Sequence, residues 1–303
     1  RIACDLHPGV FSLIQGGKRD VGQAVVQHPL IRAVGFTGSL GGGRALFDLC
    51  AARPEPIPFF GELGSVNPMF LLPGAATARA AEIGTGWAGS LTMGAGQFCT
   101  NPGIAVVLEG DDSLAFAQAA RDALAQAPAQ AMLTDGIAQA YTGGAASVAD
   151  QPGIETLIHS ECGTREARPF LFRVKAEDWL GNETLAEEVF GPLGLIIVAR
   201  DADEMVSIAQ SFKGQLTATL QLDDGDAALG QRLLPILERM AGRVLANGFP
   251  TGVEVCDTMV HGGPYPASTN FGATSVGTLS IRRWLRPVCY QNLPAGLLPT
   301  DLD

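Results

Sequence analysis

The chain has 303 residues, of which 47% are hydrophobic and 17% charged, so its composition argues against a disordered protein and allows one or two packed domains. Its formal net charge of -11 argues against a nucleic-acid-binding or basic membrane-facing surface. No apolar run of about 18 residues predicts a transmembrane helix. Six scattered cysteines, none in a C-x-x-C pair or near a histidine at metal-ligand spacing, predict a cytoplasmic protein without a metal site.

Short apolar segments alternate with helical patterns along the chain. The predicted strands are residues 9–14, 33–36, 69–72, 104–108, 193–199, 216–222 and 244–246. The predicted helices are residues 21–27, 42–52, 75–92, 112–126, 202–210 and 227–240. This alternation predicts an α/β fold with a mostly parallel sheet and right-handed crossovers. Residues 142–168, rich in Gly, Ala and polar side chains, are predicted to be irregular.

Two segments suggest boundaries between parts of the chain. The prolines of Pro54-Glu-Pro-Ile-Pro58 end the helix that starts near Gly42 and suggest a hinge between two lobes. Residues 275–294 contain an apolar stretch after the last helix. They predict either a strand or arm that packs against a neighbouring subunit or a strand that closes its own domain.

A glycine-rich turn follows the predicted strand 33–36, in the sequence Gly38-Ser39-Leu-Gly-Gly-Gly43. Backbone N–H groups at a helix N-terminus favour a phosphate, and glycines allow it to approach closely. The turn lacks both the G-x-G-x-x-G pattern and the lysine of a P-loop. Taken alone, it favours the alternative of a turn that needs glycines only for packing.

Glu62 lies in a tight glycine turn close to Phe59, Phe60 and Val66. A carboxylate beside apolar side chains has its pKa raised, and this change would make Glu62 a general base. The alternative is an exposed loop glutamate. Taken alone, the residue favours that alternative.

Cys99 lies in a second glycine-bounded turn, between two apolar segments. A free cysteine is commonly a small buried apolar residue, but a thiolate here would be a nucleophile. No lysine or arginine is adjacent in sequence, so any activation of the thiol must come from the fold. The four histidines are dispersed, and each is predicted to be a surface or hydrogen-bonded core residue: His7, His28, His159 and His261.

The segment Glu187-Glu188-Val-Phe190-Gly-Pro192 leads into the predicted strand 193–199. A glutamate at the carboxyl edge of a sheet can accept hydrogen bonds from a ribose, and a phenylalanine can pack on a planar ring. The alternative is a solvated acidic turn.

The four elements occur in an order that resembles the aldehyde dehydrogenase superfamily over essentially the whole chain. The resemblance implies a parallel-sheet catalytic domain and the C-terminal part of a Rossmann-like cofactor domain. It places a partial dinucleotide-binding domain at residues 1–63, a catalytic domain at 64–274 and a C-terminal strand or arm, a candidate oligomerisation segment, at 275–303.

The resemblance also implies a role for each motif residue. Cys99 would attack the aldehyde to form a thiohemiacetal and then a thioester, and its backbone N–H would stabilise the oxyanion. Glu62 would activate the hydrolytic water. The residues implied in cofactor binding are Gly38 and Ser39 at the pyrophosphate, Glu188 at the nicotinamide ribose, and Phe190 and the Leu63 backbone at the nicotinamide ring.

The C-terminal segment from His261-Gly-Gly-Pro-Tyr-Pro266 onward resembles one branch of this superfamily. That branch contains 2-oxoglutarate semialdehyde (2,5-dioxopentanoate) dehydrogenases and NADP-linked fatty aldehyde enzymes. The resemblance implies 2-oxoglutarate semialdehyde as substrate, NAD or NADP as cofactor with NADP favoured, and a homodimer or homotetramer in the full-length parent. Arg282 and Arg283 are candidate anchors for an anionic substrate, although salt bridges along the arm are the favoured alternative.

Members of the family carry an oxyanion-hole asparagine and a cofactor-binding lysine before the region matched here. The chain starts with Arg1, inside the expected cofactor domain, so we expect either a fragment of a longer protein or a truncated relative. We expect these 303 residues alone to oxidise aldehydes poorly. The main alternative function is a non-catalytic structural or subunit-interaction module, and an acyl-transfer or thioesterase use of Cys99 is a third interpretation.

Overall fold

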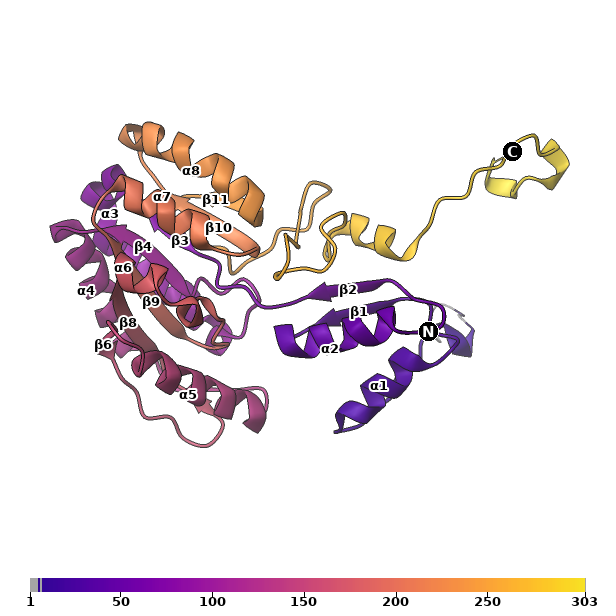
Figure 1. Cartoon of the computed structure of the whole chain (residues 1–303), viewed down its shortest axis with the longest axis horizontal. Helices are drawn as coiled ribbons and strands as arrows, with labels where there is room; N and C mark the ends of the chain where they lie inside the picture. The colour runs from indigo at the N-terminus through magenta and orange to yellow at the C-terminus, as the bar shows by residue number, and fades with distance from the viewer. Residues whose placement is uncertain (1–4, 6, 303) are drawn as a thin grey trace.

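The computed structural model describes residue 5 and residues 7–302, and its main body is a seven-stranded sheet (Figure 1). The strand order is β11-β10-β3-β4-β9-β8-β6. Every neighbouring pair is parallel except β6 and β8. The strands are β3 (Met69–Leu71), β4 (Ile104–Leu108), β6 (Glu155–Ile158), β8 (Phe170–Lys175), β9 (Leu193–Ala199), β10 (Gln215–Gln221) and β11 (Ala241–Ala246).

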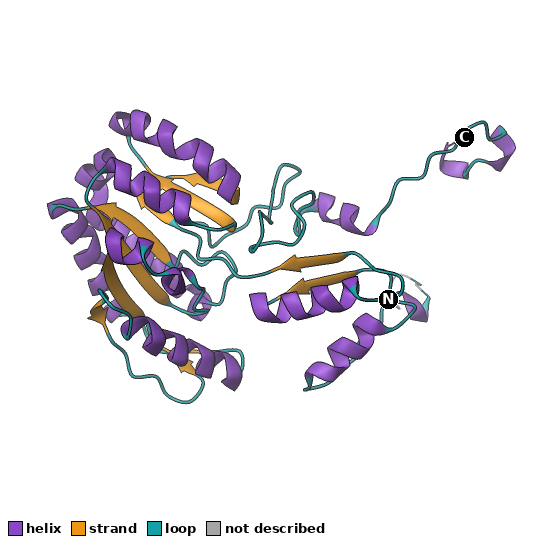
Figure 2. Cartoon of the chain, in the orientation of Figure 1, coloured by secondary structure: helices purple, strands orange, loops and turns teal. Residues whose placement is uncertain are grey.

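Helices cover both faces of this sheet (Figure 2). One face packs on α3 (Pro73–Thr92) and α4 (Asp111–Ala125), and the other packs on α5 (Asp135–Ala149), α6 (Ala176–Leu180), α7 (Ala202–Ser211) and α8 (Ala227–Met240). The sequence of β9 is continuously apolar because both of its faces are buried. Ile196 packs in the core on the α3 side, whereas Leu195 and Ile197 pack in the core on the other side. Burial on both faces is what a parallel sheet demands.

A smaller unit lies beside the main sheet (Figure 1). Strands β1 (Val34–Thr37) and β2 (Phe59–Glu62) pair in parallel, with Thr37 opposite Glu62. Helices α1 (Arg19–Gln27) and α2 (Leu40–Ala51) accompany these strands, and α2 connects the two strands. A further antiparallel pair joins β5 (Gln130–Ala131) and β7 (Glu166–Ala167).

The C-terminal segment is built from short 3-10 turns. In the described part after β11 there is no strand, and the turns are η6 (Thr278–Trp284), η7 (Ala295–Leu297) and η8 (Thr300–Leu302). Trp284 packs edge-on against Phe60 of β2 at 5.3 Å, so η6 lies on the smaller sheet. The rest of the arm extends away from the body (Figure 1). A strand that closes its own domain is therefore not formed in the described part of this segment, while the arm's domain limits and its packing against a neighbouring subunit stay predictions.

The predicted α/β class with a mainly parallel sheet is confirmed, and each expected helix and strand except residues 9–14 occurs within three residues of its predicted bounds. Strands β2 and β8 and helix α6 were not predicted. Residues 9–14 are not a strand: η2 (Pro8–Val10) is followed by an extended segment with exposed Phe11, Leu13 and Ile14. No described strand pairs with this segment, and an isolated strand has no partner for its backbone hydrogen bonds.

The prediction that residues 142–168 are irregular is wrong, because they contain the end of α5, all of β6 and all of β7. The buried residues of α5 recur at helical spacing: Ala138, Tyr141, Ala145 and Val148. Glu62 ends strand β2 and does not lie in a glycine turn.

Within the described part of the chain, no helix combines the length and apolar character needed to cross a bilayer.

Candidate active site

The structure brings Cys99 and Glu62 together at the junction of the two sheets. Cys99 precedes β4 and therefore lies at the amino end of the main sheet, whereas Glu62 lies at the carboxyl end of β2. A third residue, His261, lies between them. Its Nε2 is 3.3 Å from Cys99 Sγ and 4.0 Å from Glu62 Oε2.

A left-handed turn shapes the loop before Cys99. Within η3 (Met93–Gly96), Gly94, Ala95 and Gly96 have φ values of 57°, 59° and 65°. A methyl group on Gly96 would overlap the backbone carbonyl of Gly191, so this position needs glycine. The loop therefore packs directly against the segment that follows Phe190.

Asn101 ties these two loops together. Its side-chain amide donates to the carbonyl oxygens of Gly96 at 3.0 Å and Gly191 at 2.9 Å. The loop that carries Cys99 and the loop that carries Glu188 and Phe190 are thus held as one unit.

Asn67 fixes the Cys99 loop from the other side. It is fully buried with a φ of 48°. Its amide nitrogen donates to the carbonyl oxygens of Cys99 and Asn101, each at 2.9 Å, and its Oδ1 accepts from the backbone N–H of Thr217 on β10 at 3.2 Å. Because every partner is buried or half-buried, this network positions the thiol on a rigid support.

Glu62 is held by a segment that runs beside the end of β2. The following residue, Leu63, donates its backbone N–H to Ala267 O at 2.8 Å. Glu62 is 5% exposed, and its Oε2 is buried without a hydrogen-bond partner among the described residues. Burial raises the pKa of Glu62 to about 7, against smaller lowering effects from the Ser275 hydroxyl and the Arg283 charge. This is the direction expected from its apolar neighbours.

The thiol and the imidazole of the site are also desolvated. Burial raises the pKa of Cys99, and the Glu62 charge raises it further, while the backbone N–H groups of Cys99 and Thr100 lower it. Burial lowers the pKa of His261, and the Arg243 charge lowers it again. The imidazole is therefore neutral near neutral pH, and its Nε2 lies within hydrogen-bonding distance of the thiol.

Sequence reasoning did not single out His261. It lies 162 residues from Cys99, in a segment without regular secondary structure, so no local pattern relates the two. The available signal was its position at the head of the His261-Gly-Gly motif. Gly262 lies beside Glu62, since a Cβ there would make an ordinary contact of 3.9 Å with Glu62 Oε1.

The turn between β1 and α2 fits a phosphate group. Ser39 is the N-cap of α2, and its Oγ accepts from Gly42 N at 3.3 Å. The space where Gly41 would carry a Cβ is open. Gly38 donates its N–H to Glu62 O at 3.1 Å, so this turn and Glu62 share the carboxyl edge of the smaller sheet. Free N–H groups at a helix N-terminus suit the pyrophosphate of a dinucleotide.

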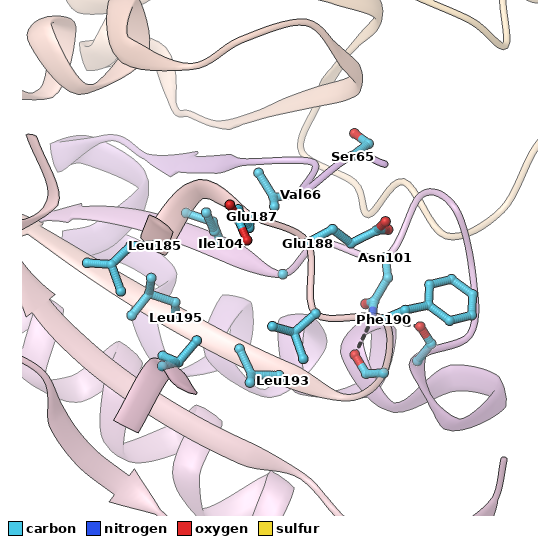
Figure 3. Close-up of a pocket in the computed structure, with 15 residues that line it drawn as sticks. Ser65, Val66, Asn101, Ile104, Leu185, Glu187, Glu188, Phe190, Leu193 and Leu195 are labelled. Atoms are coloured by element: carbon cyan, nitrogen blue, oxygen red, sulfur yellow. Dashed lines mark hydrogen bonds between the residues drawn. The ribbon is translucent and has the colours of Figure 1, made fainter. Parts of the chain in front are cut away.

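Glu188 and Phe190 line a pocket with Ser65, Val66 and Asn101 (Figure 3). Surrounding groups desolvate the Glu188 carboxylate and raise its pKa to about 7, although the residue as a whole is exposed.

Leu63 is buried, and its side chain packs where a Cβ of Gly43 on α2 would lie. Only its backbone is therefore left to face a ligand. The open helix N-terminus at Gly38 and Ser39 and the pocket lined by Glu188 and Phe190 are features that a nicotinamide dinucleotide site needs.

Comparison with known proteins identifies the family. A sequence profile described as "Aldehyde dehydrogenase family" matches residues 2–161, which is more than half of the chain. The chain belongs to the aldehyde dehydrogenase family. It is 50% identical to alpha-ketoglutaric semialdehyde dehydrogenase 2 of Azospirillum brasilense over 297 residues, which are 97% of this chain and 57% of that protein. It is 44% identical to the alpha-ketoglutaric semialdehyde dehydrogenase of Acinetobacter baylyi, with 97% and 56% covered.

Solved structures of aldehyde dehydrogenases share the fold. A 1-pyrroline-5-carboxylate dehydrogenase aligns with a TM-score of 0.75 at 19% identity, over 94% of this chain and 55% of that one. A betaine aldehyde dehydrogenase of Staphylococcus aureus, solved with NAD+, aligns with a TM-score of 0.72 at 18% identity, over 88% and 53%. The expected aldehyde-dehydrogenase-like fold is thus confirmed. The chain spans a little over half the length of the curated relatives it matches.

Proposed function

We propose that this chain carries the nucleophile and the general base for NAD(P)-dependent oxidation of an aldehyde to a carboxylic acid, with 2-oxoglutarate semialdehyde as the substrate. The observation that carries the proposal is the contact of Cys99 Sγ with His261 Nε2 at 3.3 Å. Glu62 Oε2 lies 4.0 Å from the same nitrogen. The names of the two semialdehyde dehydrogenase relatives support the substrate.

The first half of the reaction uses Cys99 and His261. The thiol proton moves to His261 Nε2, and the sulfur attacks the aldehyde carbon to form a C–S bond. The carbonyl electron pair moves to oxygen, and we assign the Cys99 backbone N–H to stabilising that oxyanion. The product of this step is a thiohemiacetal on Cys99.

The chemistry that a bound nicotinamide dinucleotide would supply is acceptance of the hydride from the thiohemiacetal carbon. We assign Gly38 and Ser39 to the pyrophosphate, Glu188 to the nicotinamide ribose, and Phe190 with the Leu63 backbone to the faces of the ring. The cofactor is NAD or NADP, and the resemblance of the C-terminal segment favours NADP.

The second half of the reaction uses Glu62. Its ionised carboxylate removes a proton from water, the hydroxide oxygen attacks the thioester carbon, and the C–S bond breaks. The acid leaves and the thiol is restored on Cys99. Because its pKa is about 7, Glu62 has substantial ionised and protonated populations near neutral pH, as a base that recycles its proton requires.

We also propose that residues 1–63 bind dinucleotide, that 64–274 form the catalytic domain and that the arm 275–303 contacts a second subunit of a homo-oligomer. The arm exposes apolar side chains, among them Leu285, Val288 and Leu297, and these would be buried in such a contact.

A test of the site that needs no cofactor uses a chromogenic acetate ester. We expect Cys99 of the 303-residue chain to be acylated with release of the phenolate, and 2-oxoglutarate semialdehyde to protect Cys99 from iodoacetamide by forming the thiohemiacetal. Cys99→Ala should abolish both signals, whereas Cys162→Ala, which removes another half-buried thiol, should preserve them. An unreactive Cys99, or acylation that survives Cys99→Ala, would overturn the proposal and favour the non-catalytic module.

A further inference from the structure

Arg243 stands out among the cationic residues because of how it is held. It lies on β11 opposite Thr217 of β10. Its Nη1 donates to Gly252 O at 2.9 Å and its Nη2 donates to Pro250 O at 2.6 Å. These two carbonyls belong to the loop that follows β11, so the guanidinium has a fixed orientation.

Some N–H groups of the Arg243 guanidinium have no hydrogen-bond acceptor among the described residues. The two carbonyl acceptors engage two of its five N–H groups. Its Nε is buried and has no hydrogen-bond acceptor among residue 5 and residues 7–302. No described carboxylate lies within 4.0 Å of it. A buried donor without an acceptor is costly, and a bound anion would supply the missing acceptor.

Arg243 lies next to the segment that carries His261, since a Cβ on the preceding Gly242 would be 2.3 Å from Gly262 O. Its guanidinium lowers the pKa of His261, and the Cys99 thiolate in turn opposes the lowering of the pKa of Arg243 by burial. The ionisable groups that raise the pKa of Cys99 are the acids Glu62 and Glu188. An aldehyde that also carried a carboxylate would be repelled by both acids when they are ionised, and Arg243 is the cation placed to offset this repulsion.

The arginines suggested by the sequence are placed differently. Arg283 lies over the rings of Phe60 at 5.7 Å and Trp284 at 5.5 Å, on the Glu62 side of the site. Arg282 is exposed on η6. Neither has a buried donor that lacks an acceptor among the described residues.

We propose that Arg243 binds the carboxylate of an aldehyde whose carbonyl carbon is at Cys99, and so selects anionic over neutral aldehydes. This inference rests on the proposed function, because it takes Cys99 as the residue that the substrate reaches. A planar guanidinium whose Nε–H lacks an acceptor among the described residues matches a carboxylate better than a lysine ammonium would.

The test compares two alkylating reagents that differ in charge. Iodoacetate is an anion and iodoacetamide is neutral, and each is displaced at carbon by the Cys99 thiolate with loss of iodide. We expect Arg243→Gln to lower the ratio of the iodoacetate rate to the iodoacetamide rate at Cys99 by about tenfold. Mass spectrometry of the Cys99 peptide separates this thiol from the others.

Several controls make the ratio decisive. Arg282→Gln removes the same charge from the arm and should leave the ratio unchanged, and Arg243→Lys should retain part of the anion preference. An unchanged ratio in Arg243→Gln would overturn the proposal, and so would an equal fall of both rates, which indicates an effect on the thiolate alone. Failure of the proposed function has a different signature, because the aldehyde would then not protect Cys99 in the unaltered chain.

Discussion

His261 Nε2 lies between Cys99 Sγ at 3.3 Å and Glu62 Oε2 at 4.0 Å, although the three residues come from three distant segments. One nitrogen thus contacts the nucleophile and lies within 4.0 Å of the base. When it takes the thiol proton, the imidazole becomes a cation beside Glu62 and favours the ionised carboxylate. Formation of the thiolate and preparation of the base for thioester hydrolysis are therefore coupled through this histidine.

This relationship predicts a specific loss of thiol reactivity in His261→Asn. Burial already raises the pKa of Cys99, and the variant removes the neighbouring group that accepts its proton. We expect the rate of Cys99 alkylation by iodoacetamide at about pH 7 to fall about tenfold. The two proteins should converge at alkaline pH, where the thiol ionises without help.

The pH profile separates this role from a structural one. His159→Gln, at an exposed histidine that packs on Phe170, should show the unaltered profile. A His261→Asn profile that is lowered equally at every pH would mean that the loop has lost its shape, and would refute the proton-acceptor role.

The raised pKa of Glu62 predicts that the free energy of unfolding depends on pH. Its pKa rises from 4.5 to about 7 on folding, so the folded state binds this proton more tightly than the unfolded state. The stabilisation by the neutral form is complete below about pH 4.5 and is lost as the pH rises through about 7. We expect the stability difference between Glu62→Gln and the unaltered chain to shift in favour of the variant by up to about 3 kcal/mol over this range.

Urea unfolding at both ends of that pH range measures this change. Glu238→Gln, at an exposed position on α8, provides the matched control and should show no such trend. A constant difference between Glu62→Gln and the unaltered chain would show that the carboxylate does not titrate abnormally in the folded state.

The sequence was sufficient for the elements whose signal is local. Strand β9 is a continuous apolar run buried on both faces, and α8 has a strong helical period, so both were predicted within a residue. Cys99 and Glu62 were found because glycine-bounded motifs mark them. The contact of His261 with Cys99 depends on chain segments 162 residues apart, and residues 9–14 have the apolar content of a strand without a described partner. Tertiary pairing decides such cases.

The hydrogen bonds of Asn67 allow a prediction of how much the buried network under Cys99 contributes to the free energy of unfolding. Asn67→Ala removes the donor to the Cys99 and Asn101 carbonyls and the acceptor for Thr217, leaving buried groups unpaired. We expect the free energy of unfolding to fall by roughly 3–5 kcal/mol, as measured with urea. Asn292→Ala is the control for the left-handed backbone, because Asn292 has a φ of 57° but is exposed. Equal losses in the two variants would assign the whole effect to backbone conformation.

Gly96 predicts that the shape of the turn controls both stability and thiol reactivity. In Gly96→Ala the added methyl group meets the Gly191 backbone, which Asn101 holds in place, so neither loop can move without breaking a hydrogen bond. Together with the φ of 65°, this should cost roughly 3 kcal/mol or more and displace Cys99 from His261. Iodoacetamide kinetics at Cys99 should then lose their dependence on His261, so that adding His261→Asn to Gly96→Ala has no further effect.

Gly143→Ala is the matched control: this glycine is exposed on α5 with open space around it, and alanine there should stabilise the helix by about 0.5–1 kcal/mol. A stable Gly96→Ala protein with normal Cys99 kinetics would show that the two loops are not held as one unit.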